Sequence, residues 1–272
     1  MTPNKAQPCD HATHADSCAH ETPELYGLIG YPLGHSFSQK FFTEKFATEG
    51  IHAEYRNFEI QHIDALSGLI AEHPNLRGLN VTIPHKQAVI HLLDTLSDEA
   101  RAIGAVNVIR VMPPADDNGS RPRLKGFNSD VIGFRDSLKP LLQPHHDHAL
   151  VLGTGGASKA VIHALDTLGI TWQYVSRKPA AGQLTYDDLT PDIMDEYTLI
   201  VNCTPLGMSP NVGTCPDIPY ECLTHRHLLY DLVYNPEETL FLRRGRESGA
   251  TTKNGLEMLH RQAVESWKMW HE

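Results

Sequence analysis

The most specific motif in this sequence is Val151-Leu152-Gly153-Thr154-Gly155-Gly156-Ala157-Ser158. Its glycine turn, 153–157, follows a short apolar run at 149–152 and precedes residues 158–168, where apolar side chains recur at helical spacing. A glycine-rich turn between a strand and a helix is the context in which a dinucleotide phosphate binds. Gly153 permits the tight turn, and Gly155 leaves room for a pyrophosphate because no Cβ intervenes. The helix start then offers free N–H groups and the favourable end of the helix dipole.

The motif departs from the usual fingerprint at its third position, where Ser158 replaces Gly or Ala. We expect the additional Gly156 to compensate by loosening the turn. Glycine-rich turns also arise for steric reasons alone, but the flanking strand and helix favour a cofactor site. The predicted cofactor-binding residues of the turn are Gly153, Thr154, Gly155, Gly156 and Ala157.

The next predicted strand, 170–176, ends in Ser176-Arg177-Lys178. An NAD site usually has an acidic residue there, on the ribose hydroxyls. Two cations and a hydroxyl instead suit a 2′-phosphate, to which an Arg can make paired hydrogen bonds. A solvated basic turn is the alternative interpretation. The segment therefore favours NADP(H), with Ser176, Arg177 and Lys178 as cofactor-binding residues.

The rest of the chain alternates between strand and helix patterns, which predicts an α/β fold. Upstream we expect strands at 25–30, 53–60, 79–83, 106–111 and 123–127, helices at 36–48, 63–72 and 86–96, and an exposed loop at 112–122. Downstream we expect a helix at 129–142 and strands at 149–152, 170–176, 199–203 and 228–234. The last segment is an amphipathic helix whose apolar stripe, which must pack against another element, comprises Leu256, Leu259, Ala263, Trp267 and Trp270.

Composition excludes several classes of protein. The chain has 272 residues, 40% of them hydrophobic, and a formal net charge of −10. Without a basic run it does not suit nucleic acid, and no apolar stretch is long enough to span a membrane. Residues 1–22 lack the pattern of a signal peptide, and five widely spaced cysteines do not form a disulfide framework. We therefore expect a cytoplasmic protein that acts on a small molecule.

The first 23 residues are expected to form a disordered tail. They contain Cys9, His11, His14, Cys18 and His20, which are metal-ligating residue types. The tail has no apolar periodicity that would fix such ligands in space, so no metal site is predicted.

Lys86 and Asp130 are the candidate catalytic residues. Transfer of a hydride to a ketone produces an alkoxide that needs a proton, which a lysine can donate while a carboxylate orients it. Both residues follow predicted strands, and ligand clefts form at strand ends in open α/β sheets. Taken alone, the two residues would form an ordinary surface ion pair.

The sequence resembles the shikimate dehydrogenase family from Tyr26 to Ala263. Several segments carry the resemblance in the family's order: 30–38 (GYPLGHSFS), 80–86 (NVTIPHK), 104–107 (GAVN), 128–134 (NSDVIGF), 153–158 (GTGGAS), 202–208 (NCTPLGM), 230–236 (YDLVYNP) and 255–259 (GLEML) with Gln262. Two departures are Ser129, where the family often has Thr, and Asn254, where it often has Asp.

The resemblance implies NADPH-dependent reduction of 3-dehydroshikimate to shikimate in aromatic amino-acid biosynthesis. It implies that Lys86 and Asp130 form the catalytic pair and that the substrate is bound by Ser36, Ser38, Thr82, Asn107, Tyr234 and Gln262. Thr204 and Gly255 join the cofactor-binding residues. Ser36 also has an ordinary interpretation as the N-cap of the phenylalanine-rich helix, and the two roles are compatible.

The expected architecture is an N-terminal α/β substrate domain, 24–127, followed by a Rossmann-like NADP-binding domain, 128–251. By the resemblance, 252–272 return to the first domain, so that the last helix packs there. A monomer and a homodimer are both open. The alternatives are a quinate/shikimate dehydrogenase of dual specificity and a non-catalytic dinucleotide-binding module, although the pattern Ser36-x-Ser38 favours shikimate.

Overall fold

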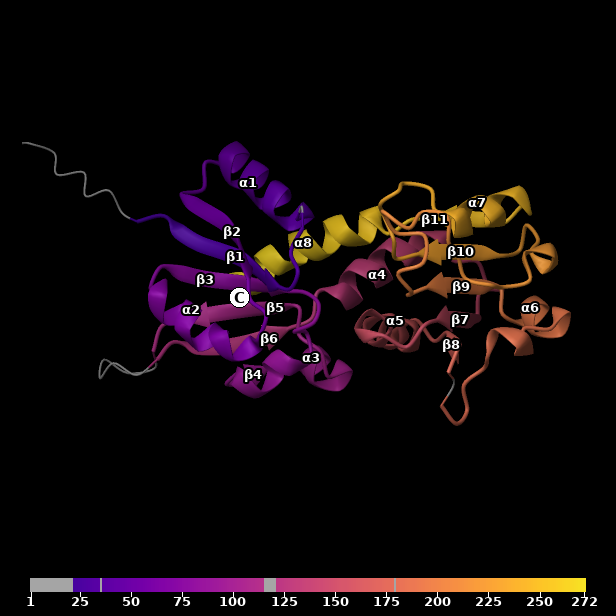
Figure 1. Cartoon of the computed structure of the whole chain (residues 1–272), viewed down its shortest axis with the longest axis horizontal. Helices are drawn as coiled ribbons and strands as arrows, with labels where there is room; N and C mark the ends of the chain where they lie inside the picture. Colours follow the sequence, from indigo (N-terminus) through magenta and orange to yellow (C-terminus); the bar gives the residue numbers. More distant parts are fainter. Residues whose placement is uncertain (1–21, 35, 115–120, 179) are drawn as a thin grey trace, which may run out of the picture.

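Two separate β-sheets organise the chain (Figure 1). The computed structural model describes residues 22–34, 36–114, 121–178 and 180–272. The first sheet has the order β2 (Ala53–Glu59), β1 (Glu24–Gly30), β3 (Leu76–Val81), β5 (Val108–Met112), β6 (Arg123–Phe127) and β4 (Thr95–Leu96). The second has the order β11 (Thr251–Lys253), β10 (Leu228–Asp231), β9 (Leu199–Asn202), β7 (His148–Leu152) and β8 (Thr171–Val175).

In the first sheet, β1 runs parallel to both β2 and β3, whereas β5 is antiparallel to β3 and β6. The carboxyl ends of β1 and β3 therefore lie at one edge, and the segments that follow them, including Thr82 and Lys86, start there. The helices of this part are α1 (Phe37–Glu49), α2 (Leu66–Glu72), which continues from the 3₁₀ turn η1 (Ile63–Ala65), and α3 (Asp98–Ile103).

The second sheet is parallel throughout. Every residue of β9 and β10 is buried, as expected for strands covered by helices on both faces. Its helices are α4 (Asp130–Leu138), α5 (Gly156–Thr167), α6 (Pro191–Glu196) and α7 (Leu240–Glu247). The glycine turn connects the strand β7 to α5, which confirms a Rossmann-like arrangement.

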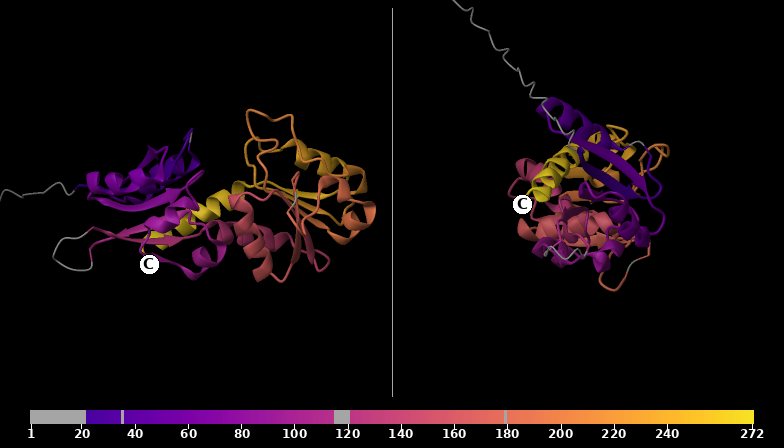
Figure 2. Two further views of the ribbon diagram at one scale, coloured as in Figure 1. Left: turned by 60° about the horizontal axis from the view of Figure 1, so that its bottom comes forward. Right: turned by 90° about the vertical axis from the view of Figure 1, so that its left-hand side faces the viewer.

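The last helix, α8 (Leu256–Trp270), runs from the second sheet back to the first, as Figures 1 and 2 show. It contacts β3 and β5, and the Trp270 ring lies 4.8 Å from the Tyr26 ring and 5.0 Å from the Phe42 ring. This packing confirms the expected return of the chain. The predicted apolar stripe is buried at its C-terminal end, whereas Leu256 is 40% exposed.

The domain limits 24–127, 128–251 and 252–272 stay a proposal. Within them, Thr252 and Lys253 pair with β10, so the return to the first sheet begins after Lys253. The expected tail, 1–23, lies outside the described residues except for 22 and 23, as do 115–120 of the expected loop.

One predicted helix is wrong. Residues 86–96 form only a 3₁₀ turn, η2 (Ala88–Leu92), and then β4, which pairs with β6. The apolar spacing is real, since Val89 is fully buried, but pairing with β6 takes Thr95 and Leu96 out of any helix. The helices α3, α6 and α7 were not predicted either, although their N-caps Ser97, Thr190 and Thr239 are visible signals in the sequence.

Candidate active site

Lys86 and Asp130 meet at the edge of the first sheet. The Lys86 Nζ donates to Asp130 Oδ2 over 2.7 Å, with 20% of the lysine side chain and 6% of the aspartate side chain exposed. The backbone carbonyl of Lys86 accepts a 2.7 Å hydrogen bond from the Val106 N–H, which fixes the turn that carries the lysine. A mobile surface ion pair does not describe this geometry, because the carboxylate is buried and its ammonium partner is held in place.

Asp130 is the first residue of α4, where the helix dipole favours a negative charge. Its backbone N–H donates to Asn128 Oδ1 over 3.1 Å, and Asn128 Nδ2 in turn donates to the Ala105 carbonyl over 3.0 Å. The buried Asn128 side chain therefore ties the start of α4 to the preceding turn, which fixes the position of the carboxylate.

Asn107 supports the second oxygen of that carboxylate. Its Nδ2 donates to Asp130 Oδ1 over 2.8 Å and to Ser129 Oγ over 3.0 Å, and lies 3.4 Å from Gln262 Oε1. Its Oδ1 accepts from the Ser129 N–H over 2.7 Å, so the orientation of the amide is determined. At position 129 the family often has Thr, and the Ser129 side chain keeps the hydroxyl group that accepts from Asn107.

A cavity of about 240 Å³ opens beside this pair. Among the residues that line it are Lys86 and all six predicted substrate-binding residues, Ser36, Ser38, Thr82, Asn107, Tyr234 and Gln262. Tyr234 comes from the second part of the chain, which forms the second sheet. The other residues come from the first part, which forms the first sheet, and from α8. Asp130 stands behind Lys86 rather than in the wall. The residues are thus brought together, and their individual roles stay predictions.

Ser36 is the N-cap of α1, because its Oγ accepts from the Gln39 N–H over 3.3 Å. This bond uses a lone pair and leaves the hydroxyl proton free to donate into the cavity. The cap role that the sequence suggested is confirmed, and it is compatible with binding an anion at this helix start.

A buried chain of polar side chains beside the cavity was not predicted from the sequence. Tyr55 donates to Asn80 Oδ1 over 2.8 Å, and Asn80 Nδ2 donates to Ser266 Oγ over 2.9 Å. Ser266 donates to the Gln262 carbonyl over 2.8 Å and lies 3.2 Å from Ser129 Oγ. Burial raises the pKa of Tyr55, so its hydroxyl stays protonated. Asn80 lies in the quoted segment 80–86, whereas nothing in the local sequence distinguishes Ser266.

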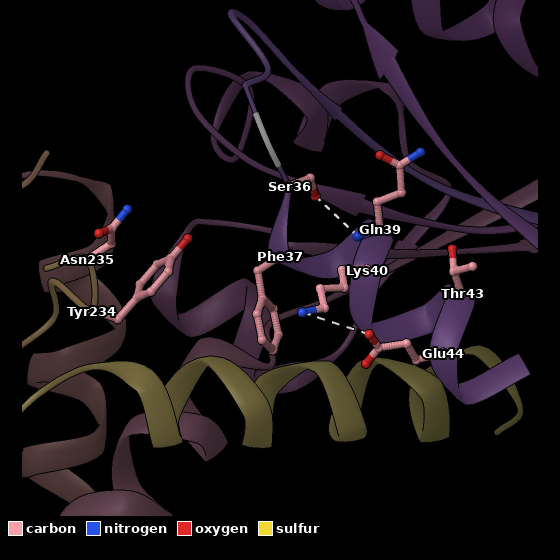
Figure 3. Close-up of a pocket in the computed structure, with 8 residues that line it drawn as sticks. All are labelled: Ser36, Phe37, Gln39, Lys40, Thr43, Glu44, Tyr234 and Asn235. Atoms are coloured by element: carbon pink, nitrogen blue, oxygen red, sulfur yellow. Dashed lines mark hydrogen bonds and ion pairs between the residues drawn. The ribbon is translucent and has the colours of Figure 1, made fainter. Parts of the chain in front are cut away.

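A wider hollow of about 610 Å³ adjoins the cavity (Figure 3). Ser36, Phe37 and Tyr234 line both spaces. In Figure 3, Tyr234 lies across from Phe37, each carried by a different part of the chain. Tyr234 is 39% exposed, and Lys40 Nζ lies 3.8 Å from Glu44 Oε1. The small cavity thus adjoins a wider hollow between the start of α1 and the loop that carries Tyr234 and Asn235.

The glycine turn between β7 and α5 fits a phosphate. Gly153 has a φ of 94°, which an L side chain rarely adopts, and a Cβ there would lie 2.9 Å from Thr204 Cγ2. At Gly155 a Cβ would point into open space, which is the space that a pyrophosphate would need. No side chain caps the start of α5, so its N–H groups are open to an anion.

Ser158 is accommodated in the third fingerprint position. The residue is fully buried, and its hydroxyl donates to the Gly155 carbonyl over 2.7 Å and lies 3.2 Å from the Tyr174 hydroxyl. A small side chain is what close packing of helix against strand requires here, and the hydroxyl finds two partners.

The predicted basic segment follows β8, the strand beside β7. Arg177 and Lys178 are exposed, and among the described residues neither forms an ion pair. Ser176 Oγ donates to the Lys178 carbonyl over 3.3 Å, which bends the turn. Because β7 and β8 are parallel, their carboxyl ends lie at the same edge of the sheet. Arg177 and Lys178 therefore lie on the same side of the sheet as the glycine turn.

The remaining predicted cofactor residues occupy different settings. Thr154 is exposed, Ala157 is half-buried in the first turn of α5, and Thr204 lies against Gly153. Gly255 is buried at the start of α8 against the Leu232 carbonyl, where a Cβ would clash. The observed packing explains the glycine at 255, and its contact with a cofactor stays a prediction.

Comparison with known proteins decides the family. Residues 28–109 match the model of the shikimate dehydrogenase substrate binding domain. The chain is 36% identical to a shikimate dehydrogenase (NADP(+)) of Desulforamulus reducens, over 91% of this chain and 89% of that protein. The chain belongs to the shikimate dehydrogenase family.

Solved structures of shikimate dehydrogenases have the same architecture. The Thermus thermophilus enzyme in complex with NADP(H) and shikimate is 31% identical, with a TM-score of 0.77 over 91% of this chain and 93% of that one. A quinate dehydrogenase from Corynebacterium glutamicum in complex with NAD is 28% identical, with a TM-score of 0.78 over 91% and 93%.

Among the described residues, no helix is long and apolar enough to cross a bilayer. In the same part of the chain, no group of three or more His, Cys, Asp or Glu side chains is placed to hold a metal ion. The tail residues Cys9, His11, His14, Cys18 and His20 lie outside it.

Proposed function

We propose that this member of the shikimate dehydrogenase family reduces 3-dehydroshikimate to shikimate with NADPH. The observation that carries the proposal is the 2.7 Å pair of Lys86 and Asp130 beside a polar cavity that Lys86 lines. Tyr234, which lines the same cavity, comes from the part of the chain that also bears the glycine turn.

The cavity offers a separate group for each polar feature of this substrate. Ser36 and Ser38, which line the cavity at the start of α1, would hold the substrate carboxylate. Thr82, Asn107 and Gln262 supply hydroxyl and amide groups for the ring hydroxyls, and Tyr234 closes the cavity from the other side.

The turn residues fit NADPH on the two features described above, the open space at Gly155 and the uncapped start of α5. Gly153 to Ala157 and Thr204 would hold the pyrophosphate side, and Ser176, Arg177 and Lys178 the 2′-phosphate. When bound, the nicotinamide supplies the hydride that the ketone carbon receives.

Reduction of the ketone also requires a proton on the carbonyl oxygen. The Lys86 ammonium is the donor, and Asp130 orients it towards the cavity. Asn107, which is bonded to the other Asp130 oxygen, prevents the carboxylate from turning away. In the reverse direction Lys86 accepts the proton from the shikimate hydroxyl.

The proposed substrate, 3-dehydroshikimate, is a small organic acid. We further propose a cytoplasmic location, on the acidic composition and the cysteine pattern, and a monomer or homodimer.

A four-way assay on purified protein tests the function: 3-dehydroshikimate and 3-dehydroquinate, each with NADPH and with NADH. We expect the highest kcat/KM for 3-dehydroshikimate with NADPH. Equal or better rates with 3-dehydroquinate and NADH would assign the enzyme to quinate instead. Tight NADPH binding without turnover of either acid would make it a binding module.

A further inference from the structure

Asp231 is a fully buried carboxylate at the end of β10. Its Oδ1 accepts from Asn202 Nδ2 over 2.9 Å and from the Val233 N–H over 3.0 Å. Its Oδ2 accepts from Thr239 Oγ1 over 2.6 Å. The three donors come from the end of β9, the segment after β10 and the cap of α7. One side chain therefore joins three segments at the carboxyl edge of the second sheet.

The first connection leads to the glycine turn, the proposed cofactor site. Asn202 Oδ1 accepts from the Thr204 N–H over 3.0 Å and from Thr204 Oγ1 over 2.7 Å. The Thr204 methyl group packs against Gly153, 2.9 Å from where a Cβ would stand. Asp231 thus fixes the Asn202 amide, which in turn fixes the residue that lies against the glycine turn.

The second connection leads to the substrate side. The Val233 N–H and the Thr239 hydroxyl, bound to the same carboxylate, stand at the two ends of residues 233–239. This loop carries Tyr234, which lines the small cavity. Thr239 Oγ1 also accepts from the Leu242 N–H over 3.3 Å, so the far end of the loop is anchored to α7.

We propose that Asp231 is a positioning residue that holds the Thr204 segment and the Tyr234 loop in register, so that cofactor and substrate meet in one geometry. This inference rests on the proposed function for the identity of the ligands. A carboxylate suits the position because it accepts hydrogen bonds at both oxygens, whereas an asparagine would turn an N–H group towards Thr239.

The two connections can be cut separately. Asn202→Ala removes the link to Thr204 and leaves the bonds of Asp231 to Val233 and Thr239. Thr239→Val removes the anchor of the Tyr234 loop and leaves Asn202 in place. Asp231→Ala removes both. Tyr230→Phe is the matched control, because it deletes a buried hydroxyl bond, 2.6 Å to Ser137, on the same strand without touching either connection.

The measurements are the Kd of NADPH from its fluorescence, the Kd of shikimate by calorimetry, and the Tm. We expect Asn202→Ala to weaken NADPH binding roughly 5- to 10-fold, as the loss of one or two hydrogen bonds would, with shikimate binding near wild type. Thr239→Val should show the reverse selectivity, and Asp231→Ala should weaken both ligands. Tyr230→Phe should lower the Tm and leave both Kd values unchanged.

The inference is overturned if Asn202→Ala and Thr239→Val lower the Tm but leave both Kd values at wild type. It is also overturned if Asn202→Ala and Thr239→Val each weaken the binding of NADPH and of shikimate equally. The two single-connection variants decide the matter even if Asp231→Ala does not fold. A wild-type protein that binds NADPH but not shikimate would refute the proposed function, while the NADPH arm would still test Asp231.

Discussion

The Lys86 ammonium lies 2.7 Å from the Asp130 carboxylate, although 44 residues separate the two in the chain. The lysine follows a strand of the first sheet, and the aspartate begins the helix that leads towards the second. The fold thus places this pair beside a cavity that Lys86 and Tyr234 both line, and most of the predictions below concern this cavity and the glycine turn.

Gly155→Ala should impair the cofactor site without destabilising the protein. The glycine has a φ of −75° and a ψ of −179°, which alanine adopts, and an added Cβ would meet open space. We expect an unchanged or slightly raised Tm and NADPH binding weaker by roughly tenfold or more, because the Cβ occupies the space for the pyrophosphate. Gly213→Ala, also in open space, is the control and should bind NADPH normally. Normal binding by Gly155→Ala would place the phosphates elsewhere.

Arg177→Asp should lower the preference for NADPH over NADH. Loss of a charge-assisted bond to the 2′-phosphate corresponds to a roughly 10- to 100-fold weaker NADPH affinity, with little change for NADH. Arg226→Asp makes the same change of charge before β10, at the opposite edge of the sheet, and should leave both affinities unchanged. Equal losses for the two cofactors in Arg177→Asp would contradict the assignment.

Ser266→Ala should weaken substrate binding from behind the cavity wall. The change leaves Asn80 Nδ2 and Ser129 Oγ without their shared partner, which we expect to cost about 1–3 kcal/mol of stability. A several-fold weaker shikimate affinity with normal NADPH affinity should accompany it. Ser137→Ala, a buried serine of the second part, should cost stability alone. If both variants bind shikimate like wild type, Ser266 is only a core residue.

The pH dependence of stability should reveal Asp231. Burial raises its pKa to about 6, above the ordinary 3.8 that applies in the unfolded chain. Because the folded state resists ionisation, the contribution of Asp231 is fully present below about pH 4 and is lost as the pH rises through 6, by up to about 3 kcal/mol. Burial also raises the pKa of neighbouring Cys203 and Tyr220, so both stay neutral in this range.

The test compares the free energy of unfolding of wild type and Asp231→Asn between pH 4 and pH 8. The difference should shift in favour of the asparagine variant as the pH rises and then level off above about pH 7. Parallel curves would mean that Asp231 ionises in the folded protein as it does in the unfolded chain.

Local patterns predicted most of the fold because they report on burial. The alternation of buried strands with amphipathic helices, together with the turn at Gly153, predicted the second sheet. The same patterns predicted a helix at 86–96 that does not form, because Thr95 and Leu96 pair with β6 despite the helical spacing of the apolar residues. The helix α7 escaped notice because its arginines obscured a short apolar face, although Thr239 signalled its start.

The candidate site was predicted only in part, from residue chemistry and from the family resemblance rather than from burial patterns. Lys86 and Asp130 came from chemistry at strand ends, whereas Ser38, Thr82 and Gln262 came only from the family resemblance. Ser266 could not be found either way, and Asp231 lies in the quoted segment 230–236 without any sign of its role. The importance of each lies in hydrogen-bond partners 137 and 29 residues distant. Hydrogen bonds across such separations are visible only once the chain is folded.

The central claim is that Lys86 donates the proton, and its most direct test is the kcat of Lys86→Met with 3-dehydroshikimate and NADPH. Acid–base groups contribute roughly 10²–10⁴-fold, so kcat should fall by that factor while the Kd of NADPH stays unchanged. Lys139→Met, at an exposed lysine, should turn over normally. A Lys86→Met enzyme that is folded, binds NADPH and retains near wild-type kcat would contradict the account.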